Sequence, residues 1–510
     1  MNRDYKISMG LNIRIDTKKY WVIAMCLFCK INMLQAQYSS GDSGSKYFFI
    51  NEDCNYMQYK NKRAFIHFFD KWKNDSTGII NVAHFGDSHV QPDIYTGVVR
   101  KGLQAMKGDA GRGMIFPYTI ARTYSAFDFS SSYTGTWKTS NSIFPKPKLP
   151  LGPSGFTCRT NDSDVSFTIN FKTPVNEKYR IIKLYCKQSK SSYDIIFKTG
   201  GNEIPVIVDS NDKPYIEIEL PNIGNTITVQ LKKQNPFENE FEFYGMSVES
   251  IDKKGVVYHN LGIGGATYSA IIEQQLFSEH FPHLDIDLAI VDFGTNDYLY
   301  KDYIPDKMES IIIETINKIR FAAPQASILL TTTQDMFRYR KNLKSGILFS
   351  ALVRKIAFDQ GCLFYDWFNV SGGINTMNVW QANGLAQRDG IHLTMKGYTL
   401  KGNLFFEALQ NSIGILSSSG KDSLVLNTDL YQNLYMRLDS GRSIQNNSSP
   451  VINNTPNPQT RKKLIYHRVR NHETLSGIAK KYHTTVEIIM TTNNLRSTQI
   501  RRGKVLVIRR

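Results

Sequence analysis

Apolar strand segments and helical patterns alternate along the second half of the chain, and this alternation limits the folds available to it. The segments run in the order 287–293 (strand), 307–321 (helix), 327–333 (strand), 344–360 (helix) and 362–368 (strand), and a last helix begins near Thr394. An earlier strand at 79–85, followed by a helix at 93–106, has the same pattern. Such alternation predicts a parallel sheet with helices on both faces.

Residues 150–255 differ in character from the segments on either side. They alternate between apolar and polar residues, are rich in Ile, Val, Tyr, Phe and Thr, and contain turn signals such as Thr199-Gly-Gly-Asn202. This pattern predicts an all-β module of about a hundred residues, a β-sandwich. Because α/β alternation flanks the module, we interpret it as an insertion into one α/β domain.

Two further segments complete the predicted domain organisation. A helical pattern at 57–73 predicts a helix that packs onto the first domain through Ala64, Phe65, Phe68, Phe69 and Trp72. Residues 440–460 are rich in Ser, Asn, Pro and Gln, which is typical of a flexible linker. The predicted boundaries are a leader at 1–36, a helical extension at 37–77, the α/β domain at 78–149 and 256–415, the β insertion at 150–255, a linker at 416–462 and a small domain at 463–510.

The first 36 residues have the order of a secretory signal peptide. Lys18 and Lys19 precede an apolar run at 20–29, and Leu34-Gln-Ala36 ends on a small residue. The run is about half of the ~20 apolar residues that a membrane-spanning helix needs, which favours cleavage over an anchor. The sequence therefore predicts an exported protein without an integral membrane anchor after cleavage, located in the periplasm or cell envelope or secreted.

Charge is distributed unevenly along the 510 residues. The formal net charge is +17, of which residues 1–36 carry +4 and residues 461–510 carry +11. The remaining residues carry only +2. An enzyme that acts on nucleic acid would be expected to have a basic main domain as well. The distribution therefore argues against nucleic acid as a partner.

Four cysteines remain after the predicted cleavage, namely Cys54, Cys158, Cys186 and Cys362. Four scattered thiols do not make a disulfide scaffold, and none has the spacing of a zinc site. Cys158 and Cys186 fall in the same β-rich segment. A disulfide formed in an oxidising compartment and two buried free thiols are both open for this pair.

The candidate chemistry begins at Gly86-Asp87-Ser88-His89, which follows the apolar strand at 79–85. Ser88 is expected at the carboxyl end of that strand and near a helix N-terminus, where backbone N–H groups favour negative charge. A serine hydroxyl needs an adjacent base to act as a nucleophile. The segment Asp389-Gly-Ile-His392 offers His392 as the base and Asp389 as the carboxylate that orients it.

Two other segments offer hydrogen-bond donors for a developing oxyanion. Asn260-Leu-Gly-Ile-Gly-Gly-Ala-Thr267 begins just after the β insertion, and its glycines allow the backbone close to a substrate. Gly294-Thr-Asn-Asp297 follows the strand at 287–293 and offers the Asn296 amide. A second Gly-Asp-Ser at 41–43 is rejected as the nucleophile, because no apolar strand precedes it.

These four segments, in this order, resemble the four blocks of the SGNH (GDSL-type) hydrolase family over roughly residues 78–145 and 256–412. The resemblance implies a flavodoxin-like α/β domain and a Ser–His–Asp ester hydrolase with no metal and no other cofactor. It assigns the nucleophile to Ser88 and the last block to Asp389 and His392. It assigns the oxyanion hole to the Ser88 N–H, the Gly265 N–H (with Gly264 the near alternative) and the Asn296 amide.

Two details narrow the resemblance. A histidine after Gly-Asp-Ser, combined with a β insertion between the first two blocks, resembles the peptidoglycan O-acetylesterases, in which the insertion is a carbohydrate-binding-like β-sandwich. We interpret His89 as a residue of the first helical turn and favour this over a second catalytic base. Trp137 and Trp380 could stack on sugars, but an aromatic residue in such a position is more often part of the core.

Residues 466–508 resemble a LysM module over nearly its whole length. The resemblance is carried by Tyr466-His-Arg-Val469, Glu473-Thr-Leu-Ser-Gly-Ile-Ala479, Asn493-Asn-Leu495 and Leu506-Val-Ile508. It implies a βααβ fold that binds peptidoglycan or another glycan containing N-acetylglucosamine. The candidate glycan contacts are Glu473, Thr474, Leu495 and Arg496. His472 stands where the module usually has glycine, so the geometry of the first ligand-binding loop does not follow from the resemblance.

These expectations combine into one primary function. It is an exported serine ester hydrolase that removes O-acetyl groups from peptidoglycan through an acetyl-enzyme and is held at the wall by LysM. One alternative is an esterase that acts on another acetylated polysaccharide or on a lipid ester. Another is a non-catalytic wall-binding envelope protein, against which the intact Ser, His, Asp and Asn set argues.

Overall fold

The computed structural model describes residues 46–74, 78–209, 212–300, 302–339, 341–426, 464–469, 473–493, 495, 497–500 and 505–509. The predicted signal peptide, the rejected serine motif at 41–43 and most of the predicted linker lie outside these residues. The chain separates into two compact units, Met1–Ile444 and Gln445–Arg510.

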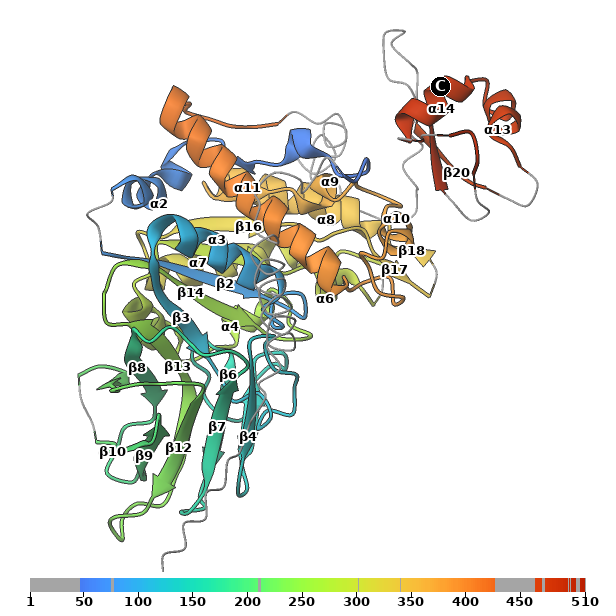
Figure 1. Ribbon diagram of the computed structural model, residues 1–510. Helices are drawn as coiled ribbons and strands as arrows, with labels where there is room; N and C mark the ends of the chain where they lie inside the picture. The colour runs from blue at the N-terminus through green and yellow to red at the C-terminus, as the bar shows by residue number, and fades with distance from the viewer. Residues whose placement is uncertain are drawn as a thin grey trace, which may run out of the picture. The chain divides into compact units, whose positions relative to one another are not determined.

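Five parallel strands form the centre of the first unit (Figure 1). They are β2 (Ile79–Gly86), β14 (Gly255–Gly262), β15 (Leu288–Asp292), β16 (Ser327–Thr331) and β19 (Leu363–Tyr365). Their spatial order is β14-β2-β15-β16-β19, and each neighbouring pair is parallel. Numbered along the chain, this is the order 2-1-3-4-5 of flavodoxin-like sheets. The predicted fold class is confirmed.

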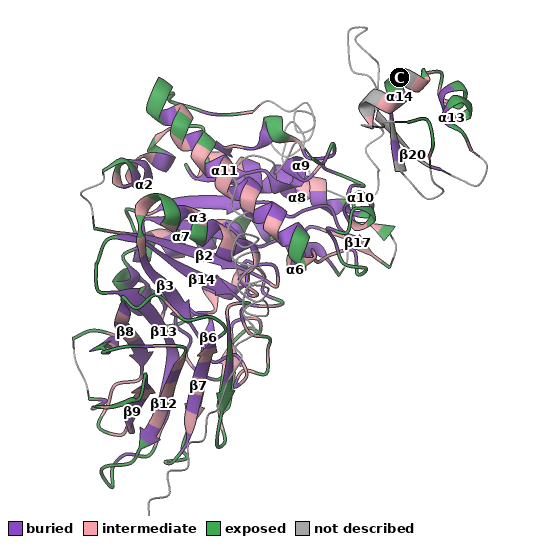
Figure 2. Cartoon of the chain, in the orientation of Figure 1, coloured by how far each residue is buried: buried purple, intermediate pink, exposed green. Residues whose placement is uncertain are grey.

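Helices cover both faces of this sheet. The main ones are α2 (Arg63–Lys73), α3 (Tyr95–Lys107), α7 (Met308–Ala322), α8 (Ser345–Asp359) and α11 (Met395–Ser419). Alternate residues of β2 face opposite cores, because side chains alternate along a strand. Val82 belongs to the buried cluster that contains residues of α2, α3 and α11, whereas Phe85 belongs to the one that contains residues of α7 and α8. Figure 2 shows the resulting buried central strands.

The β-rich region is joined to the α/β sheet rather than standing apart from it. Beyond β14 the same sheet continues through β3 (Asp109–Ile115) and β13 (Phe241–Ser250) to β6 (Phe156–Thr160) and β5 (Lys138–Asn141). A branch of the sheet leaves from β13, which also pairs with β8 (Tyr179–Cys186), and β8 pairs with β11 (Tyr215–Glu219). Two glycines of β3 make this close passage possible. A Cβ at Gly111 would lie 2.6 Å from the Val248 oxygen, and one at Gly113 would lie 2.5 Å from the Tyr258 oxygen.

A second sheet packs against this extension and completes a sandwich. Its strands, in spatial order, are β10 (Asn202–Val206), β9 (Asp194–Thr199), β12 (Thr226–Lys232), β7 (Ser166–Phe171) and β4 (Phe129–Tyr133). Phe167 of β7 and Phe243 of β13 meet between the sheets with ring centroids 4.9 Å apart. The β-rich region therefore begins at β4, earlier than the expected boundary at residue 150.

The four cysteines among the described residues are buried and free. Cys158 on β6 and Cys186 on β8 are both register partners of Phe243, from opposite sides of β13. Two strands that flank a third lie roughly 10 Å apart, beyond the reach of a disulfide. Cys158 and Cys186 are therefore two buried free thiols and do not form the disulfide that was the other alternative.

The N-terminal extension and the end of α11 close one side of the sheet. β1 (Met57–Gln58) pairs with β19, and Tyr59 pairs with Leu424. The helix expected at 57–73 therefore begins only at Arg63, although its five predicted apolar side chains are all buried. Because α11 extends to Ser419 and Leu424 pairs with Tyr59, the packed part of the chain passes the linker boundary expected at residue 416.

The second unit has the predicted βααβ order. Its elements are β20 (Leu464–Arg468), α13 (Leu475–Lys481), α14 (Val486–Thr492) and β21 (Val505–Arg509). The two strands pair antiparallel, and Val469, Leu475, Ile478, Leu506 and Ile508 belong to one small core. Across the described parts of both units, no helix combines the length and the apolar character needed to cross a membrane.

Candidate active site

The first three motif segments leave the same edge of the sheet because their strands are in register. Gly86, the last residue of β2, lies opposite Gly262 on β14 and opposite Asp292 on β15. A Cβ at Gly262 would lie 2.2 Å from the Gln91 nitrogen. Glycine at this position therefore lets the second segment pass directly beside the turn that holds Ser88.

Ser88 lies in a turn after β2 and not at the start of a helix. The Asp87 carbonyl accepts hydrogen bonds from the N–H groups of Val90 (3.1 Å) and Gln91 (3.0 Å), and α3 begins only at Tyr95. The field of a helix falls off within its first turn. The helix dipole therefore acts on Ser88 less strongly than the sequence pattern suggested. The Ser88 N–H has no hydrogen bond to any described residue.

Three predicted residues from distant parts of the chain form one hydrogen-bonded row. His392 Nε2 lies 2.9 Å from Ser88 Oγ, and His392 Nδ1 lies 2.6 Å from Asp389 Oδ2. Asp389 Oδ1 also accepts the N–H groups of Ile391 (2.9 Å) and His392 (3.0 Å). The carboxylate is therefore held in place, and with Nδ1–H donating to it, Nε2 is free to accept the serine proton.

The electrostatics of this row favour a charged Asp389 and a basic His392. The hydrogen bond to Asp389, opposed by burial, raises the pKa of His392. Burial would raise the pKa of Asp389, but its hydrogen bonds from His392 and the backbone lower that pKa to about 2. The His392 side chain is 33% exposed and that of Asp389 is 41% exposed, so a substrate can reach them.

The two glycines proposed for the oxyanion hole differ in geometry. The Gly264 N–H donates to Gln91 Oε1 at 2.5 Å and is therefore occupied. Gly265 has a left-handed backbone, with φ of 86°, and a Cβ there would meet nothing within 4 Å. Its N–H has no hydrogen bond to any described residue. Gly265 thus offers a donor beside open space, and Gly264 does not.

Asn296 lies in α6 (Thr295–Tyr298), directly after β15. Its side-chain amide donates to the Ala266 carbonyl at 2.9 Å, which ties the third segment to the second. An amide nitrogen carries two hydrogens, so one remains for a ligand. The neighbouring Asp297 accepts the Tyr268 N–H at 3.2 Å and fixes the same junction.

Two buried carboxyl groups adjoin these donors. Burial raises the pKa of Asp87 to about 6 and that of Asp297 to about 7. Each has one carboxyl oxygen without a hydrogen-bond partner among the described residues. Because burial disfavours the charged form, these groups carry less negative charge near neutral pH than exposed carboxylates would.

His89 has a role that the sequence pattern did not reveal. It is buried in the turn before α3, with Nδ1 2.8 Å from the Tyr398 hydroxyl and Nε2 3.1 Å from the Gln334 amide nitrogen. The same amide donates to the Ile391 carbonyl at 2.9 Å. His89 therefore supports the loop that carries His392, whose ring centroid is 5.2 Å away.

This geometry fits neither of the two interpretations of His89 offered by the sequence. An amide nitrogen only donates, so His89 Nε2 must accept, and the imidazole is neutral. Burial and the neighbouring His392 lower the pKa of His89 well below its ordinary value. Both ring nitrogens are occupied, which does not fit a second base. The expected place in a helix is also wrong, because α3 begins at Tyr95.

Trp137 and Trp380 were the two aromatic residues considered for stacking on a sugar. Trp380 is 2% exposed and packs edge-on against Trp367 in the core, so stacking on a sugar is excluded for it. Trp137 is partly buried, donates to the Thr134 carbonyl and packs against Phe167. Both side chains contribute to packing.

The predicted LysM contacts have structural partners of their own. Glu473 Oε2 lies 2.7 Å from Nε2 of the buried His467. The Thr474 hydroxyl caps α13 by accepting the Gly477 N–H at 3.2 Å. Leu495 packs against the small core, and Arg496 lies outside the described residues. Glycan contact by these residues stays a prediction.

A flavodoxin-like sheet with serine, histidine and aspartate hydrogen-bonded at its carboxyl edge is the arrangement of an ester hydrolase. The profile of the GDSL-like lipase/acylhydrolase family matches residues 242–400, and that of the LysM domain matches residues 467–509. The chain therefore carries a GDSL-type acylhydrolase domain followed by a LysM domain. The first match begins within β13 and does not include Ser88, whose place in the site is given by the geometry.

Three solved structures are reported for comparison, and the first of them supports the fold. A structure described as "Peptidoglycan O-acetylesterase in action" matches with a TM-score of 0.58 and 19% identity, over 70% of this chain and 99% of that chain. A family two carbohydrate esterase from Cellvibrio japonicus matches with a TM-score of 0.23 and 10% identity, over 56% and 99% of the two chains. The acetylxylan esterase Axe2 from Geobacillus stearothermophilus matches with a TM-score of 0.25 and 19% identity, over 31% and 73%. No curated protein sequence matches the chain.

Proposed function

We propose that this protein is an exported ester hydrolase that removes O-acetyl groups from peptidoglycan through an acetyl-enzyme. The observation that carries the proposal is the row Ser88–His392–Asp389, at 2.9 Å and 2.6 Å, in a GDSL-type domain on the same chain as a LysM domain. The similarity in fold to a peptidoglycan O-acetylesterase supports the choice of substrate.

Acylation begins with attack of Ser88 Oγ on the acetyl carbonyl carbon. His392 Nε2 accepts the hydroxyl proton, and Asp389 stabilises the imidazolium that forms. The N–H groups of Ser88 and Gly265 and the Asn296 amide donate to the oxyanion. Each such donor is worth on the order of 10²–10³ in rate. The imidazolium then protonates the sugar oxygen, and the C–O bond to the acetyl group breaks.

Deacylation repeats these steps with water. His392 accepts a proton from the water as its oxygen attacks the acetyl-Ser88 carbonyl, the same donors bind the second oxyanion, and the proton returns to Ser88 Oγ as acetate leaves. His89, Gln334 and Tyr398 take no proton in this scheme. They hold the loop at Ile391 so that the His392 ring stays between serine and aspartate.

The LysM domain would act as an anchor on the substrate. Linking a binding module to an enzyme raises its effective concentration at the bound surface without changing the chemical step. The +11 charge of residues 461–510 would add a salt-sensitive attraction to anionic envelope polymers. In this proposal the nearly neutral body performs the chemistry, and the basic domain keeps the enzyme at the wall.

Acetate release from a panel of purified polymers tests the substrate. Wild-type protein is incubated with O-acetylated peptidoglycan, acetylated xylan and long-chain esters, with de-O-acetylated peptidoglycan as the blank. We expect the highest kcat/KM for O-acetylated peptidoglycan. A higher value for xylan or for long-chain esters would replace the proposed substrate by another glycan or by a lipid.

Labelling with a fluorophosphonate separates an enzyme from a wall-binding protein on a hydrolase scaffold. An activated serine reacts with this probe, and an unactivated one does not. We expect labelling of wild-type protein and none of Ser88→Ala. Wild-type protein that binds peptidoglycan but neither reacts with the probe nor releases acetate from any substrate would show that the scaffold is non-catalytic.

A further inference from the structure

A short hairpin packs directly on the loop that carries the candidate base. It consists of β17 (Phe337–Arg338) and β18 (Lys341–Asn342), seen close to α6 in Figure 1. The Phe337 N–H donates to the Gly390 carbonyl at 2.8 Å, and a Cβ at Gly390 would lie 2.9 Å from the Phe337 Cβ. Gly390 lies between Asp389 and His392 in sequence, so the hairpin borders the reactive row.

The same hairpin also contacts the segment that carries the oxyanion amide. Arg338 Nη1 donates to the carbonyl of Tyr300 at 2.5 Å and approaches that of Leu299 at 3.4 Å. These residues directly follow α6, the short helix with Asn296. The hairpin therefore joins the third and fourth motif segments at the rim of the site, where the part of a substrate beyond the acetyl group would lie.

The guanidinium of Arg338 lies close to two exposed tyrosine rings. It lies 4.6 Å from the ring centroid of Tyr300 and 4.9 Å from that of Tyr339. These side chains are 68% and 84% exposed. No carboxylate among the described residues pairs with Arg338, and its Nε and Nη2 have no hydrogen bond there. A planar guanidinium fixed in this way presents two parallel donors, the geometry that binds a carboxylate.

Tyr339 adopts a backbone conformation that is unfavourable for its side chain. Its φ is 49°, in the left-handed region that bulky residues rarely occupy. Because the side chain is almost fully exposed, little burial compensates for this strain. Strain of this kind is concentrated at ligand-binding and active sites. The conformation holds the aromatic ring next to Arg338, at the rim of the site.

The hairpin is also a local concentration of positive charge in a nearly neutral body. Lys341 and Lys344 are exposed, and neither forms an ion pair with a described residue. The nearby Asp335 is buried and accepts hydrogen bonds from Asn342 and Met377, so it faces inward. The half-buried Asp302 accepts the Ser345 N–H at 2.8 Å, and the carboxylate of Asp389 is engaged by His392, so neither forms an ion pair with Arg338, Lys341 or Lys344 among the described residues. An anionic ligand at the rim would thus meet three basic side chains that have no ion-pair partner there.

We propose that Tyr300, Arg338 and Tyr339 form a subsite for a carboxylate of the acetylated glycan substrate. Arg338 binds the carboxylate through Nε and Nη2, and the two rings pack against the adjacent sugar or peptide. The proposal rests on peptidoglycan as the substrate, whose peptide stems carry carboxylates. The subsite would favour glycan units with an intact stem over neutral acetylated sugars.

The test measures binding of matched ligands to the full chain with Ser88→Ala, which prevents turnover. The ligands are soluble O-acetylated disaccharide–peptides with free carboxylates and the same material with its carboxylates converted to methylamides. Arg338→Gln and Arg338→Lys are added to this background. Arg180→Gln serves as the matched control, because Arg180 is a partly exposed arginine on β8 paired with Glu219. Calorimetry gives each dissociation constant.

We expect the parent chain to bind the free carboxylate form about 10-fold more tightly than the amidated form, as a charge-assisted hydrogen bond at a partly exposed site would produce. Arg338→Gln should reduce this ratio to about 1, Arg338→Lys should leave part of it, and Arg180→Gln should leave it unchanged. Since each ratio is taken within one variant, a general loss of folded protein does not mimic the result.

Two outcomes separate this inference from the proposed function. In the first, wild-type protein releases acetate from both ligand forms, but the parent chain shows no carboxylate preference, or Arg338→Gln leaves that preference unchanged. This result overturns the subsite and leaves the esterase. In the second, wild-type protein releases no acetate, but binding still favours the free carboxylate form and this preference depends on Arg338. This result overturns the proposed reaction and leaves the subsite.

Discussion

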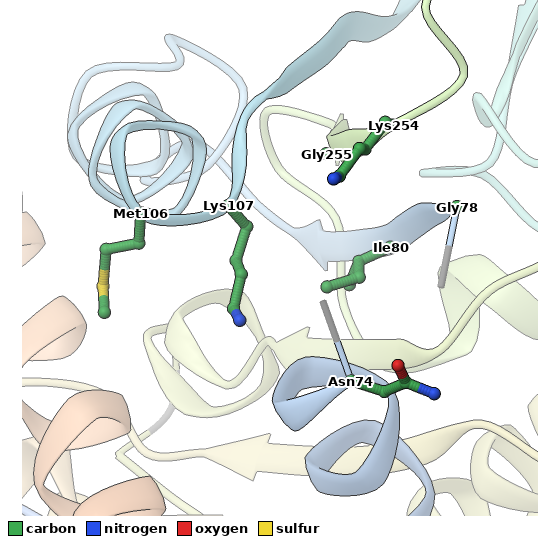
Figure 3. Close-up of a pocket in the computed structure, with 7 residues that line it drawn as sticks. All are labelled: Asn74, Gly78, Ile80, Met106, Lys107, Lys254 and Gly255. Carbon is green, nitrogen blue, oxygen red and sulfur yellow. The ribbon is translucent and has the colours of Figure 1, made fainter. Parts of the chain in front are cut away.

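The two edges of the central parallel sheet differ in what their openings contain. At the amino edge, a cavity of about 370 Å³ lies between the ends of α2 and α3 and the starts of β2 and β14 (Figure 3). Its lining residues are Asn74, Gly78, Ile80, Met106, Lys107, Lys254 and Gly255. At the carboxyl edge, Ser88, His392 and Asp389 form a hydrogen-bonded row beside the Gly265 and Asn296 donors.

Under the proposed function, the direction of the strands, and not the size of a hollow, determines where the reactive residues lie. The amino-edge cavity holds two lysines and no nucleophile with a neighbouring base, and Lys107 is engaged above the Trp72 ring at 5.3 Å. In an open α/β sheet the loops that follow the strands collect at the carboxyl edge. Here the loops after β2, β14 and β15 meet there because Gly86, Gly262 and Asp292 are in register.

The largest expected effect comes from removing the nucleophile. Ser88→Ala should reduce kcat/KM for acetate release by about 10⁴-fold or more, because the acetyl-enzyme can no longer form. Lys107→Ala, at the amino-edge cavity, should change kcat/KM by no more than about twofold, since surface substitutions away from the core and from reactive groups have small effects. Equal losses in the two variants would remove the distinction between the edges.

An asparagine at each edge gives the next comparison. Asn296→Ala should lower kcat by about 10²-fold or more on a small acetate ester, because one oxyanion donor is lost. Asn74→Ala, in the lining of the amino-edge cavity, should leave kcat close to the wild-type value. Unchanged kcat in Asn296→Ala would mean that the amide serves only its bond to the Ala266 carbonyl.

The pH profile tests the carboxyl edge through His392. The base must be neutral to accept the serine proton, and the hydrogen bond to Asp389 raises its pKa above the ordinary 6.5. Activity should therefore be lost as the pH falls through a midpoint above 6.5 in kcat/KM. Asp389→Asn should lower both the rate and this midpoint. A wild-type midpoint well below 6.5 would contradict the assignment of His392 as the base.

The smallest expected effect concerns the second unit. A chain that ends before residue 445 should keep its kcat/KM on a soluble small ester, because that unit is compact by itself. On insoluble wall its rate should fall by about 10-fold as the effective concentration is lost. Equal rates of the two chains on the wall would show that LysM does not localise the enzyme.

The sequence pattern predicts the α/β sheet and the residues of the carboxyl edge because both depend on local order. Buried strands such as 79–85 are followed by turns whose residue types belong to hydrolase chemistry, and parallel strands bring those turns together. The hydrogen bonds Ser88–His392 and His392–Asp389 join residues that the motif resemblance had already paired. The distinction between Gly264 and Gly265 required the position of Gln91, which no motif contains.

The features that sequence reasoning missed depend on contacts between segments far apart in the chain. Gln334 lies in no motif, yet its amide bonds both His89 and the Ile391 carbonyl. The continuity of the β sandwich with the central sheet depends on the pairing of β3 with β13, which local alternation does not specify. Trp380 is a core residue because Trp367 covers it, and its own neighbours in sequence do not show this.

The most direct test of the account traps the acetyl-enzyme and finds where the acetyl group is. Wild-type protein and substrate are mixed, quenched in acid within the first turnover, digested and analysed by mass spectrometry, with Ser88→Ala treated in the same way. We predict an acetylated peptide that contains Ser88 in the wild type and no acetylated peptide in the variant. An acetyl group on another residue, or acetate release by Ser88→Ala at the wild-type rate, would contradict the central claim.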